Sequence, residues 1–284
     1  MEYTITKLLG QGYFGKVFLG KTPDDKEIAI KIQGKGDTYR DEHRLAQEAR
    51  IMLKLNHPYI IRGYDFKYID NKAIITMEYI QGKNLYDILK KLVVLPFDLA
   101  RFYLAEIAIG LDYLHSNKIL YRDLKPDNMI ISVTGHVKLT DFGLSKFLLH
   151  PNTKGFSVCG TLEYIAPEII MNVGYGFSAD WWSYAVLAYE IVCGVVPISI
   201  SSKSSLKQKT LNTKIELPSI LTAEIKDFLT RILVRNPKFR IGFSDLQKLQ
   251  WMEKLDWNRL FAGTLDPPLN PYSICKNGKK LFTL

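Results

Sequence analysis

Cysteine is scarce in this sequence, and its spacing excludes two classes of protein. Three cysteines occur in 284 residues, at positions 159, 193 and 275. An odd number of widely separated cysteines provides neither a disulfide framework nor the close pairs of a zinc site. We therefore expect a protein of a reducing compartment, the cytoplasm or the nucleus.

Targeting and membrane-spanning signals are also missing. Residues 1–4 do not form a basic region followed by an apolar one, so no signal peptide is expected. The longest apolar stretch, Trp181 to Ile200, has about the length of a bilayer span, but Glu190 lies in its middle and a glycine and a proline interrupt its end. A buried core helix, with Asp180 as its N-cap, is therefore predicted instead of a membrane span.

Acidic residues are fewer than basic ones, 29 against 38, which gives a formal net charge of +9. Such an excess can indicate an anionic partner, such as nucleic acid, a membrane surface or a nucleotide phosphate. The basic residues are scattered, with small clusters only at 203–209 and 276–280, and no basic stripe with interleaved aromatics occurs. A solvated basic surface is the favoured interpretation, and no nucleic-acid partner is expected.

The composition is that of a soluble globular protein, with 47% hydrophobic and 24% charged residues. In the first eighty residues, β-branched and aromatic segments alternate with Gly, Pro, Asp and Asn turns, which predicts β-structure. From 39 to 55, apolar residues recur at helical spacing instead. The expected strands are Tyr3–Leu9, Lys16–Leu19, Glu27–Ile32, Tyr64–Ile69 and Ala73–Glu78.

After Gln81-Gly82 the pattern changes to mostly helix. The expected helices are Leu85–Leu92, Phe97–Asn117, Ala179–Cys193, Thr222–Leu233 and Ser244–Lys248. The chain thus predicts an α+β fold with two lobes, a small β-rich lobe over 1–80 and a larger helical lobe over 81–260. The hinge should lie near 78–82, and 261–284 should form a short C-terminal tail.

A glycine-rich segment separates the first two predicted strands. It reads Gly10-Gln11-Gly12-Tyr13-Phe14-Gly15-Lys16-Val17, which contains G-x-G-x-x-G-x-V. Glycines let backbone N–H groups approach phosphate oxygens closely. An ordinary hairpin and a dinucleotide-binding loop are the alternatives, but a dinucleotide loop precedes a helix, whereas residues 17–19 resemble a strand. The segment therefore favours a phosphate-binding hairpin.

A lysine ends the third predicted strand, Ile28-Ala29-Ile30-Lys31. Lysines that face inward are rarely buried without a partner. Glu48, on the following helix, is the candidate partner of Lys31, and a lysine held in this way would bind the phosphates of ATP. The alternative is an exposed lysine at the end of a strand.

Two neighbouring loops carry the residue types that phosphoryl transfer requires. They read Tyr121-Arg122-Asp123-Leu124-Lys125-Pro126-Asp127-Asn128 and Asp141-Phe142-Gly143. This reaction needs oxygen ligands for Mg²⁺, cations on the phosphates and an acceptor for the hydroxyl proton. The carboxylate, amide and ammonium groups in the two loops supply all of these.

Six ordered motifs resemble those of the eukaryotic serine/threonine protein kinases. They are the glycine segment, Lys31, Glu48, the Arg122-Asp123 loop, Asp141-Phe142-Gly143 and Ala166-Pro167-Glu168, and the resemblance extends from about Tyr3 to Leu260. It implies a bilobal kinase fold, ATP and Mg²⁺ as cofactors, and protein substrates phosphorylated on Ser or Thr.

The resemblance also implies a role for each matching residue. Asp123 would be the catalytic base, and Lys125 would neutralise charge on the transferred phosphoryl group. Asn128 and Asp141 would bind Mg²⁺, and Lys31 would contact the α- and β-phosphates. For the adenine ring, the resemblance implies contacts with Val17, Ala29 and Ile130, with Met77 at the back of the pocket and with the hinge backbone from Glu78 to Ile80. It also implies a buried structural ion pair between Glu168 and Arg240.

A finer resemblance is to the AGC group of kinases, which includes the cyclic-nucleotide-dependent, protein kinase C-like and ribosomal-protein kinases. It rests on Tyr121 and on four segments: Cys159–Tyr164, Asp180–Ser183, Trp251–Trp257 and the proline-rich 266–271. The Lys125-Pro126-Asp127-Asn128 segment resembles serine/threonine kinases and not tyrosine kinases. Ser157 occupies the group's activation-loop phosphorylation site. The resemblance implies a phosphate cradle of Arg44, Arg122 and Lys146, and an upstream activating kinase.

The chain departs from the AGC pattern at several positions. Leu162 replaces a proline, Ala185 replaces a glycine, and Gly63 falls where a bulky spine residue is usual, unless Tyr64 takes its place. The tail carries no evident Phe-x-x-Phe motif. The missing tail motif weakens the expectation that the tail docks onto the small lobe.

Substrate preference is partly readable from acidic residues. Asp127, Glu163 and Glu190 stand where basophilic relatives face substrate arginines, whereas Asn84 replaces another acid. We expect a basic residue before the target Ser or Thr, with weaker selectivity three residues upstream.

Two alternatives come from other classes of protein. A pseudokinase scaffold that binds nucleotide without phosphotransfer would lack at least one of Lys31, Asp123, Asn128 and Asp141, and all four are present. A small-molecule kinase of similar fold would not need the Ala166-Pro167-Glu168 segment, which in protein kinases helps build the protein-substrate platform.

Overall fold

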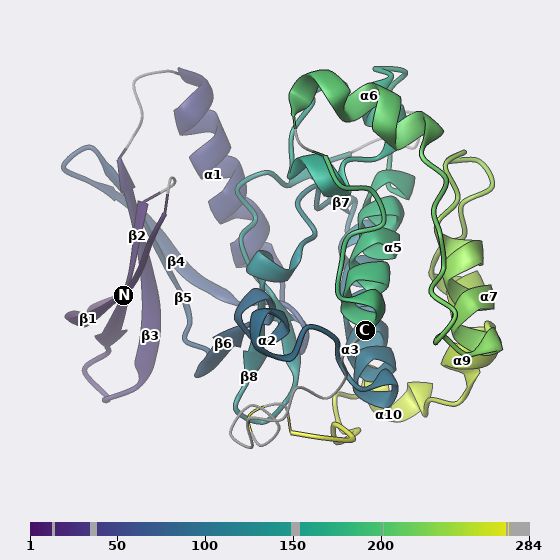
Figure 1. Cartoon of the computed structure of the whole chain (residues 1–284). Coiled ribbons are helices and arrows are strands. Elements are labelled where there is room, and N and C mark those ends of the chain that lie inside the picture. Colours follow the sequence, from purple (N-terminus) through teal and green to yellow (C-terminus); the bar gives the residue numbers. More distant parts are fainter. Residues whose placement is uncertain (13–14, 35–38, 149–153, 201, 271, 273–284) are drawn as a thin grey trace.

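The computed structural model describes residues 1–12, 15–34, 39–148, 154–200, 202–270 and 272. A β-rich part formed by the first third of the chain lies beside a mainly helical part formed by the rest (Figure 1). The predicted division into a small β-rich lobe and a larger helical lobe is confirmed.

The small lobe is built on a five-stranded antiparallel sheet in the order β1-β2-β3-β5-β4. Helix α1 (Tyr39–Lys54) packs on this sheet through a buried stripe that includes Leu45, Ala49 and Met52. That stripe repeats every three or four residues, which is the spacing of one helix face. The strands are β1 (Thr4–Gly12), β2 (Gly15–Lys21), β3 (Glu27–Gly34), β4 (Gly63–Ile69) and β5 (Lys72–Glu78).

Gly63, at the start of β4, allows α1 to approach the sheet closely. A Cβ at this position would lie 2.9 Å from both the carbonyl carbon and the Cβ of Met52. These distances are too short for real contacts, so any larger residue would push the helix away. Where a bulky side chain is usual in the AGC kinases, the α1 backbone at Met52 therefore packs directly on Gly63.

Behind the hinge, short strands carry the catalytic loops. Strands β6 (Gly82–Asn84), β8 (Met129–Ser132) and β9 (Val137–Leu139) form a small sheet in the order β6-β8-β9, and β7 (Ile119–Leu120) pairs with β10 (Lys146–Phe147). The 3₁₀ turns η1 (Pro126–Asn128) and η2 (Leu162–Tyr164) lie within the loops that follow β7 and β10.

The large lobe surrounds two long buried helices, α3 (Phe97–Ser116) and α5 (Ser178–Cys193). Nearly every side chain of α5 is buried, as predicted for a core helix, and none of the described helices is both long and apolar enough to span a membrane. The others are α2 (Leu85–Leu92), α4 (Pro167–Ile170), α6 (Lys203–Asn212), α7 (Ala223–Ile232), α8 (Phe243–Leu246), α9 (Gln250–Glu253) and α10 (Trp257–Phe261).

The prediction that Asp180 caps α5 was wrong. The helix begins earlier, at Ser178, so Asp180 lies in its first turn and is 1% exposed. Its carboxylate accepts hydrogen bonds of 2.8 Å from the backbone N–H groups of Tyr121 and Arg122 and lies 2.8 Å from His115 Nε2. Buried N–H groups of a loop need acceptors, so Asp180 supports the loop before Asp123 instead of its own helix.

Candidate active site

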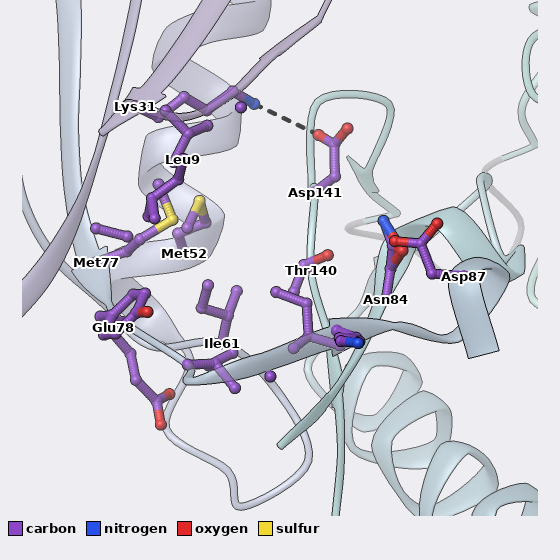
Figure 2. Close-up of a pocket in the computed structure, with 18 of the residues that line it drawn as sticks. Leu9, Lys31, Met52, Ile61, Met77, Glu78, Asn84, Asp87, Thr140 and Asp141 are labelled. Carbon is purple, nitrogen blue, oxygen red and sulfur yellow. Dashed lines mark hydrogen bonds and ion pairs between the residues drawn. The ribbon is translucent and has the colours of Figure 1, made fainter. Parts of the chain in front are cut away.

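A cavity of about 500 Å³ lies between the two lobes. Side chains from the sheet, α1, the hinge and the loop before Asp141 line it (Figure 2). The predicted residues among its lining are Gly10, Val17, Ala29, Lys31, Glu48, Met77, Glu78, Ile80, Ile130 and Asp141. Residues far apart in the chain therefore meet at one site.

Lys31 lies at the inner wall of this cavity with two carboxylates. Its Nζ is 2.5 Å from Glu48 Oε1 and 3.5 Å from Asp141 Oδ1, and Figure 2 shows Lys31 and Asp141 facing one another across the pocket. Burial alone would lower the pKa of Lys31, but the negative charges of Glu48 and Asp141 outweigh it and raise the pKa above the usual value. The amine is thus a fixed cation, suited to bind phosphate oxygens.

The glycine segment forms the β1–β2 hairpin over the cavity. Gly10 lines the cavity, and Gln11 and Gly12 pair with Lys16 and Gly15 across the hairpin. Gly15 has φ +125° and a Cβ there would collide with the Ile32 carbonyl, so only glycine fits. Tyr13 and Phe14, also predicted to contact nucleotide, lie outside the described residues.

Asp123 is held by three neighbours at the start of the catalytic loop. Its Oδ2 accepts a 2.8 Å hydrogen bond from Asn128 Nδ2 and lies 3.0 Å from Lys125 Nζ. Thr161 joins the two, since its hydroxyl donates to Asp123 Oδ1 at 3.3 Å and accepts from Lys125 at 2.9 Å. In the sequence Thr161 stood out only as part of the Cys159–Tyr164 segment; in the structure it connects the catalytic loop with the activation segment.

Asn128 and Asp141 have oxygen atoms suitable for Mg²⁺. Asn128 uses its Nδ2 to bind Asp123, which orients its amide oxygen away from that contact. Asp141 Oδ1 accepts hydrogen bonds from the Gly143 N–H and from Lys31, so Oδ2 is the oxygen that could bind a metal. One carboxylate and one amide oxygen, completed by phosphate oxygens, match the ligands Mg²⁺ prefers. These two residues would hold the metal, which when bound neutralises charge on the phosphates.

Two residues of the catalytic loops have left-handed backbone conformations. Arg122 has φ +71° and Asp141 has φ +53°. Residues other than glycine adopt this region at an energetic cost and do so often at functional sites. At both positions the side chain is held by a hydrogen bond, Arg122 to Ser157 and Asp141 to Lys31.

Apolar side chains line the other end of the cavity. Ala29 and Met77 are each 6% exposed, and Val17 and Ile130 complete the predicted surface for the adenine ring. The Glu78 carboxylate is turned to Lys138 at 2.8 Å. Cavity residues that the sequence did not indicate are Leu9, Met52, Ile61, Lys83, Asp87 and Thr140. Asp87 lies beside Asn84 at the start of α2 (Figure 2).

Helix α1 is attached to the activation segment by a further contact. Gln47 Nε2 donates a 2.7 Å hydrogen bond to the backbone carbonyl of Ser145. Because Gln47 precedes Glu48, this bond keeps the helix in the position at which Glu48 reaches Lys31. Arg44 lies one turn earlier and is half-buried.

Ser157 contacts part of the predicted phosphate cradle. Arg122 Nη1 lies 2.9 Å from Ser157 Oγ, as the resemblance implies. Tyr175, which was not predicted, donates its hydroxyl to the Ser157 carbonyl at 2.8 Å and lies 3.2 Å from Oγ. Lys146 is half-buried on β10, and no hydrogen bond joins it to Ser157 within the described chain. Of the predicted cradle residues, Arg122 directly contacts Ser157 within the described chain.

Three acidic residues lie close together beside the catalytic loop. Tyr164 donates a hydrogen bond to Glu190. Burial raises the pKa of Glu190, and the nearby carboxylates of Asp127 and Glu163 raise it further. Asp127 is exposed, and neither it nor Glu163 forms an ion pair with any described residue. This surface attracts a cation.

The activation segment is anchored to the large lobe by a buried ion pair. Arg240 Nη1 and Nη2 lie 2.7 and 3.0 Å from the two carboxylate oxygens of Glu168. Arg240 also donates to backbone carbonyls of Ser178, Val234 and Arg235. The ion pair is bidentate, and the remaining guanidinium N–H groups donate to these carbonyls, as a buried charge requires.

Comparison with known proteins agrees with this geometry. The family model described as "Protein kinase domain" matches residues 3–252. The chain therefore belongs to the protein kinase family, whose members use ATP and Mg²⁺, and the predicted fold and family are confirmed.

The chain is also similar to several ribosomal protein S6 kinases. The chain is 37% identical to Ribosomal protein S6 kinase 2 alpha from Xenopus laevis and to Ribosomal protein S6 kinase alpha-1 from Homo sapiens, over 95% of its own length. It is 36% identical to human Ribosomal protein S6 kinase alpha-6 over 96% of its length. In each case it spans 38% of the relative's length.

Proposed function

We propose that this chain is an ATP-dependent serine/threonine protein kinase that transfers the γ-phosphate of ATP to protein hydroxyls. One observation supports it above the others: Lys31 and Asp141 face one another at the cavity between the lobes, and Asn128, which binds Asp123, accepts a backbone hydrogen bond from Thr140 of the cavity wall. Positioning and charge neutralisation supply most of the catalysis in phosphoryl transfer.

In this function each residue has a defined task. Lys31 would bind phosphate oxygens, and Asn128 and Asp141 would hold Mg²⁺. Asp123 would accept the proton of the substrate hydroxyl, and Lys125, which contacts Asp123 and Thr161, would neutralise charge on the phosphoryl group. A pseudokinase would retain the cavity without this complete set, so phosphotransfer is the function to test first.

A degenerate peptide library with ATP and Mg²⁺ tests activity and specificity together. We expect phosphorylation of Ser and Thr peptides that carry a basic residue before the acceptor. The Asp141→Asn variant is the control, because it removes a metal ligand and should remove activity. A wild-type chain that binds ATP without transferring phosphate would contradict the proposal, and indifference to basic residues would contradict the specificity.

The raised pKa of Glu190 leads to a pH prediction. A carboxyl with a raised pKa loses its charge at a higher pH than an ordinary glutamate, so acidification removes part of the charge that attracts a basic substrate. We expect KM for a basic peptide to increase about 3- to 10-fold as the pH is lowered, and the increase should begin at a higher pH than an ordinary glutamate, with a pKa of about 4.3, would cause. A peptide without basic residues should show no such change. In Glu190→Gln the KM should be higher throughout, with a weaker pH dependence.

Ser157 is the proposed regulatory phosphorylation site. A phosphate adds about two negative charges and can pair with Arg122, which would fix the segment that follows Gly143. We expect Ser157→Ala to lower kcat/KM about 10- to 100-fold without changing the thermal midpoint. Ser157→Thr should retain activity. Unchanged phosphotransfer in Ser157→Ala would rule the switch out.

The proposed substrates, activator and cellular location of the enzyme follow from its family and its composition. We propose protein substrates, an upstream activating kinase as one source of the phosphate on Ser157, and a location in the cytoplasm or nucleus. The support is the family membership together with the sparse cysteines.

A further inference from the structure

One face of helix α1 contacts the activation segment. Gln47, Arg50 and Lys54 lie at positions i, i+3 and i+7 of the helix, which places them on one face. Gln47 Nε2 donates a 2.7 Å hydrogen bond to the backbone carbonyl of Ser145. The charged groups of Arg50 and Lys54 lie 5.5 and 5.7 Å from the centre of the Phe147 ring, within range of a cation–π interaction. These three residues, the α1 stripe, thus join a helix of the small lobe to the large lobe.

Ser145 gives the α1 stripe a firm attachment point. The residue is 2% exposed, and its N–H donates to the Phe142 carbonyl at 3.0 Å. Its hydroxyl donates to the Tyr121 carbonyl at 3.1 Å, and the N–H of Tyr121 donates to Asp180 in the core helix α5 at 2.8 Å. The carbonyl that Gln47 binds therefore belongs to a residue that is tied through the catalytic loop to the centre of the large lobe.

We propose that Gln47 is a positioning residue, which holds α1 and its Glu48 against Lys31 without help from a phosphate on Ser157. The inference rests on the proposed kinase function and adds one residue to it. Glu48 is the next residue in the helix, is 2% exposed and lies 2.5 Å from Lys31 Nζ through its Oε1. The contacts of the α1 stripe involve neither Ser157 nor Arg122, so they can form whether or not Ser157 carries a phosphate.

Within the α1 stripe, the hydrogen bond of Gln47 is the contact that fixes the position of the helix. A hydrogen bond to a carbonyl constrains distance and direction together, and loss of a donor is costly where the acceptor belongs to a buried residue. Arg50 and Lys54 are exposed and lie over the same ring, and a cation–π attraction is weak at an exposed site. The two cations therefore support the attachment that Gln47 sets.

The alternative is that the bond of Gln47 only stabilises the helix. A contact of that kind changes the free energy of unfolding and leaves the kinetics of the folded enzyme as they are. A positioning residue instead changes catalysis through the group that it positions, which here is the Glu48 carboxylate that holds Lys31. Catalysis measured with and without Glu48 separates the two.

The test uses the full chain with Ser157→Ala, which cannot carry the phosphate. Gln47→Met nearly keeps the length and helix propensity of the side chain and removes the donor. We expect it to lower kcat/KM for ATP about 10-fold, the effect of one hydrogen bond to a buried group, with the KM for a basic peptide unchanged within about two-fold. Gln250→Met is the matched control: Gln250 is exposed on α9, and this variant should have the kinetics of its parent chain.

Addition of Glu48→Gln shows whether Gln47 acts through Glu48. In that background Gln47→Met should lower kcat/KM by less than about two-fold, because residues that act through one another do not have additive effects. A further loss as large as that in the parent chain would overturn the proposal, as would a kcat/KM in Gln47→Met equal to that of its parent. Complete inactivity of Ser157→Ala beside an active wild type would overturn it too, since the arrangement would then need the phosphate.

Hydrogen exchange gives a readout that does not depend on activity. Backbone amides of α1 should exchange about 10-fold faster in Gln47→Met than in its parent chain, because the helix then opens locally more often. Gln250→Met should leave their exchange unchanged. Unchanged exchange in Gln47→Met, with a wild type that phosphorylates basic peptides, overturns the proposal while the kinase function stands. A wild type that phosphorylates no peptide overturns the kinase function and the proposal with it.

Discussion

Asp123→Asn should lower kcat by about 10²- to 10⁴-fold, the range for removal of a positioned general base. Asparagine cannot take the proton of the substrate hydroxyl. Asn128 donates to Asp123 Oδ2 and Thr161 donates to Oδ1, so the one side-chain oxygen of asparagine can keep the hydrogen bond from Asn128, while its amide NH₂ can donate to the Thr161 hydroxyl in place of the present bond. The loop geometry should therefore persist, and the KM for ATP should stay within about two-fold, because no ATP-binding group changes. Steady-state kinetics with a basic peptide measure both parameters.

A matched substitution separates this effect from a general loss of charge. Asp245, on α8, is exposed, and its one ion pair among the described residues is with Lys248, at 3.6 Å. Asp245→Asn removes the same charge with the same change of side chain, and its kinetics should equal those of the wild type. Should Asp123→Asn retain more than a tenth of the wild-type kcat, Asp123 is not the base and another group must accept the proton.

The secondary structure was predicted best where hydrophobic periodicity dominates. Helix α2 was expected at Leu85–Leu92 and has these bounds, and β3 extends the expected Glu27–Ile32 by two residues. Helix α6 was not expected, because its sequence shows a basic cluster and no apolar stripe. Of its described side chains only Leu206 and Thr210 are buried, so its position depends on the surrounding lobe.

The site was predictable to the extent that it consists of motifs. Lys31, Glu48, Asp123 and Asp141 stand in short patterns whose chemistry is readable. The structure places Lys31, Glu48 and Asp141 at one cavity, and Asp123 in the catalytic loop, where it binds Asn128. What single motifs could not show are contacts between distant segments, such as Tyr175 with Ser157. Such contacts depend on tertiary packing. Nothing in the sequence around either residue indicates that the two lie together.

The same reason explains the error at Asp180. An aspartate before an apolar run is a common N-cap pattern, and nothing local distinguishes it from a buried acceptor for another loop. Only the folded chain shows that the amides of Tyr121 and Arg122 lie within 2.8 Å of its carboxylate. The residue proved to be structural support for catalysis, not for its helix.

Arg240→Met should destabilise the large lobe by about 3–5 kcal/mol, because it leaves the buried Glu168 carboxylate without its partner. This loss is large beside the roughly 5–15 kcal/mol that holds a typical domain folded. Urea unfolding monitored by tryptophan fluorescence can measure it, since the Arg240 guanidinium lies 5.3 Å from the centre of the Trp182 ring. The midpoint should shift to lower urea.

A double substitution distinguishes a lost pair from lost packing. Glu168→Leu with Arg240→Met removes both charges, so no buried charge is left unpaired, and the double variant should be more stable than Arg240→Met alone. Backbone carbonyls of Ser178, Val234 and Arg235 still lose a donor, so full recovery is not expected. Additive losses in the double variant would mean that the ion pair itself contributes nothing, and that the guanidinium acts only through those carbonyls.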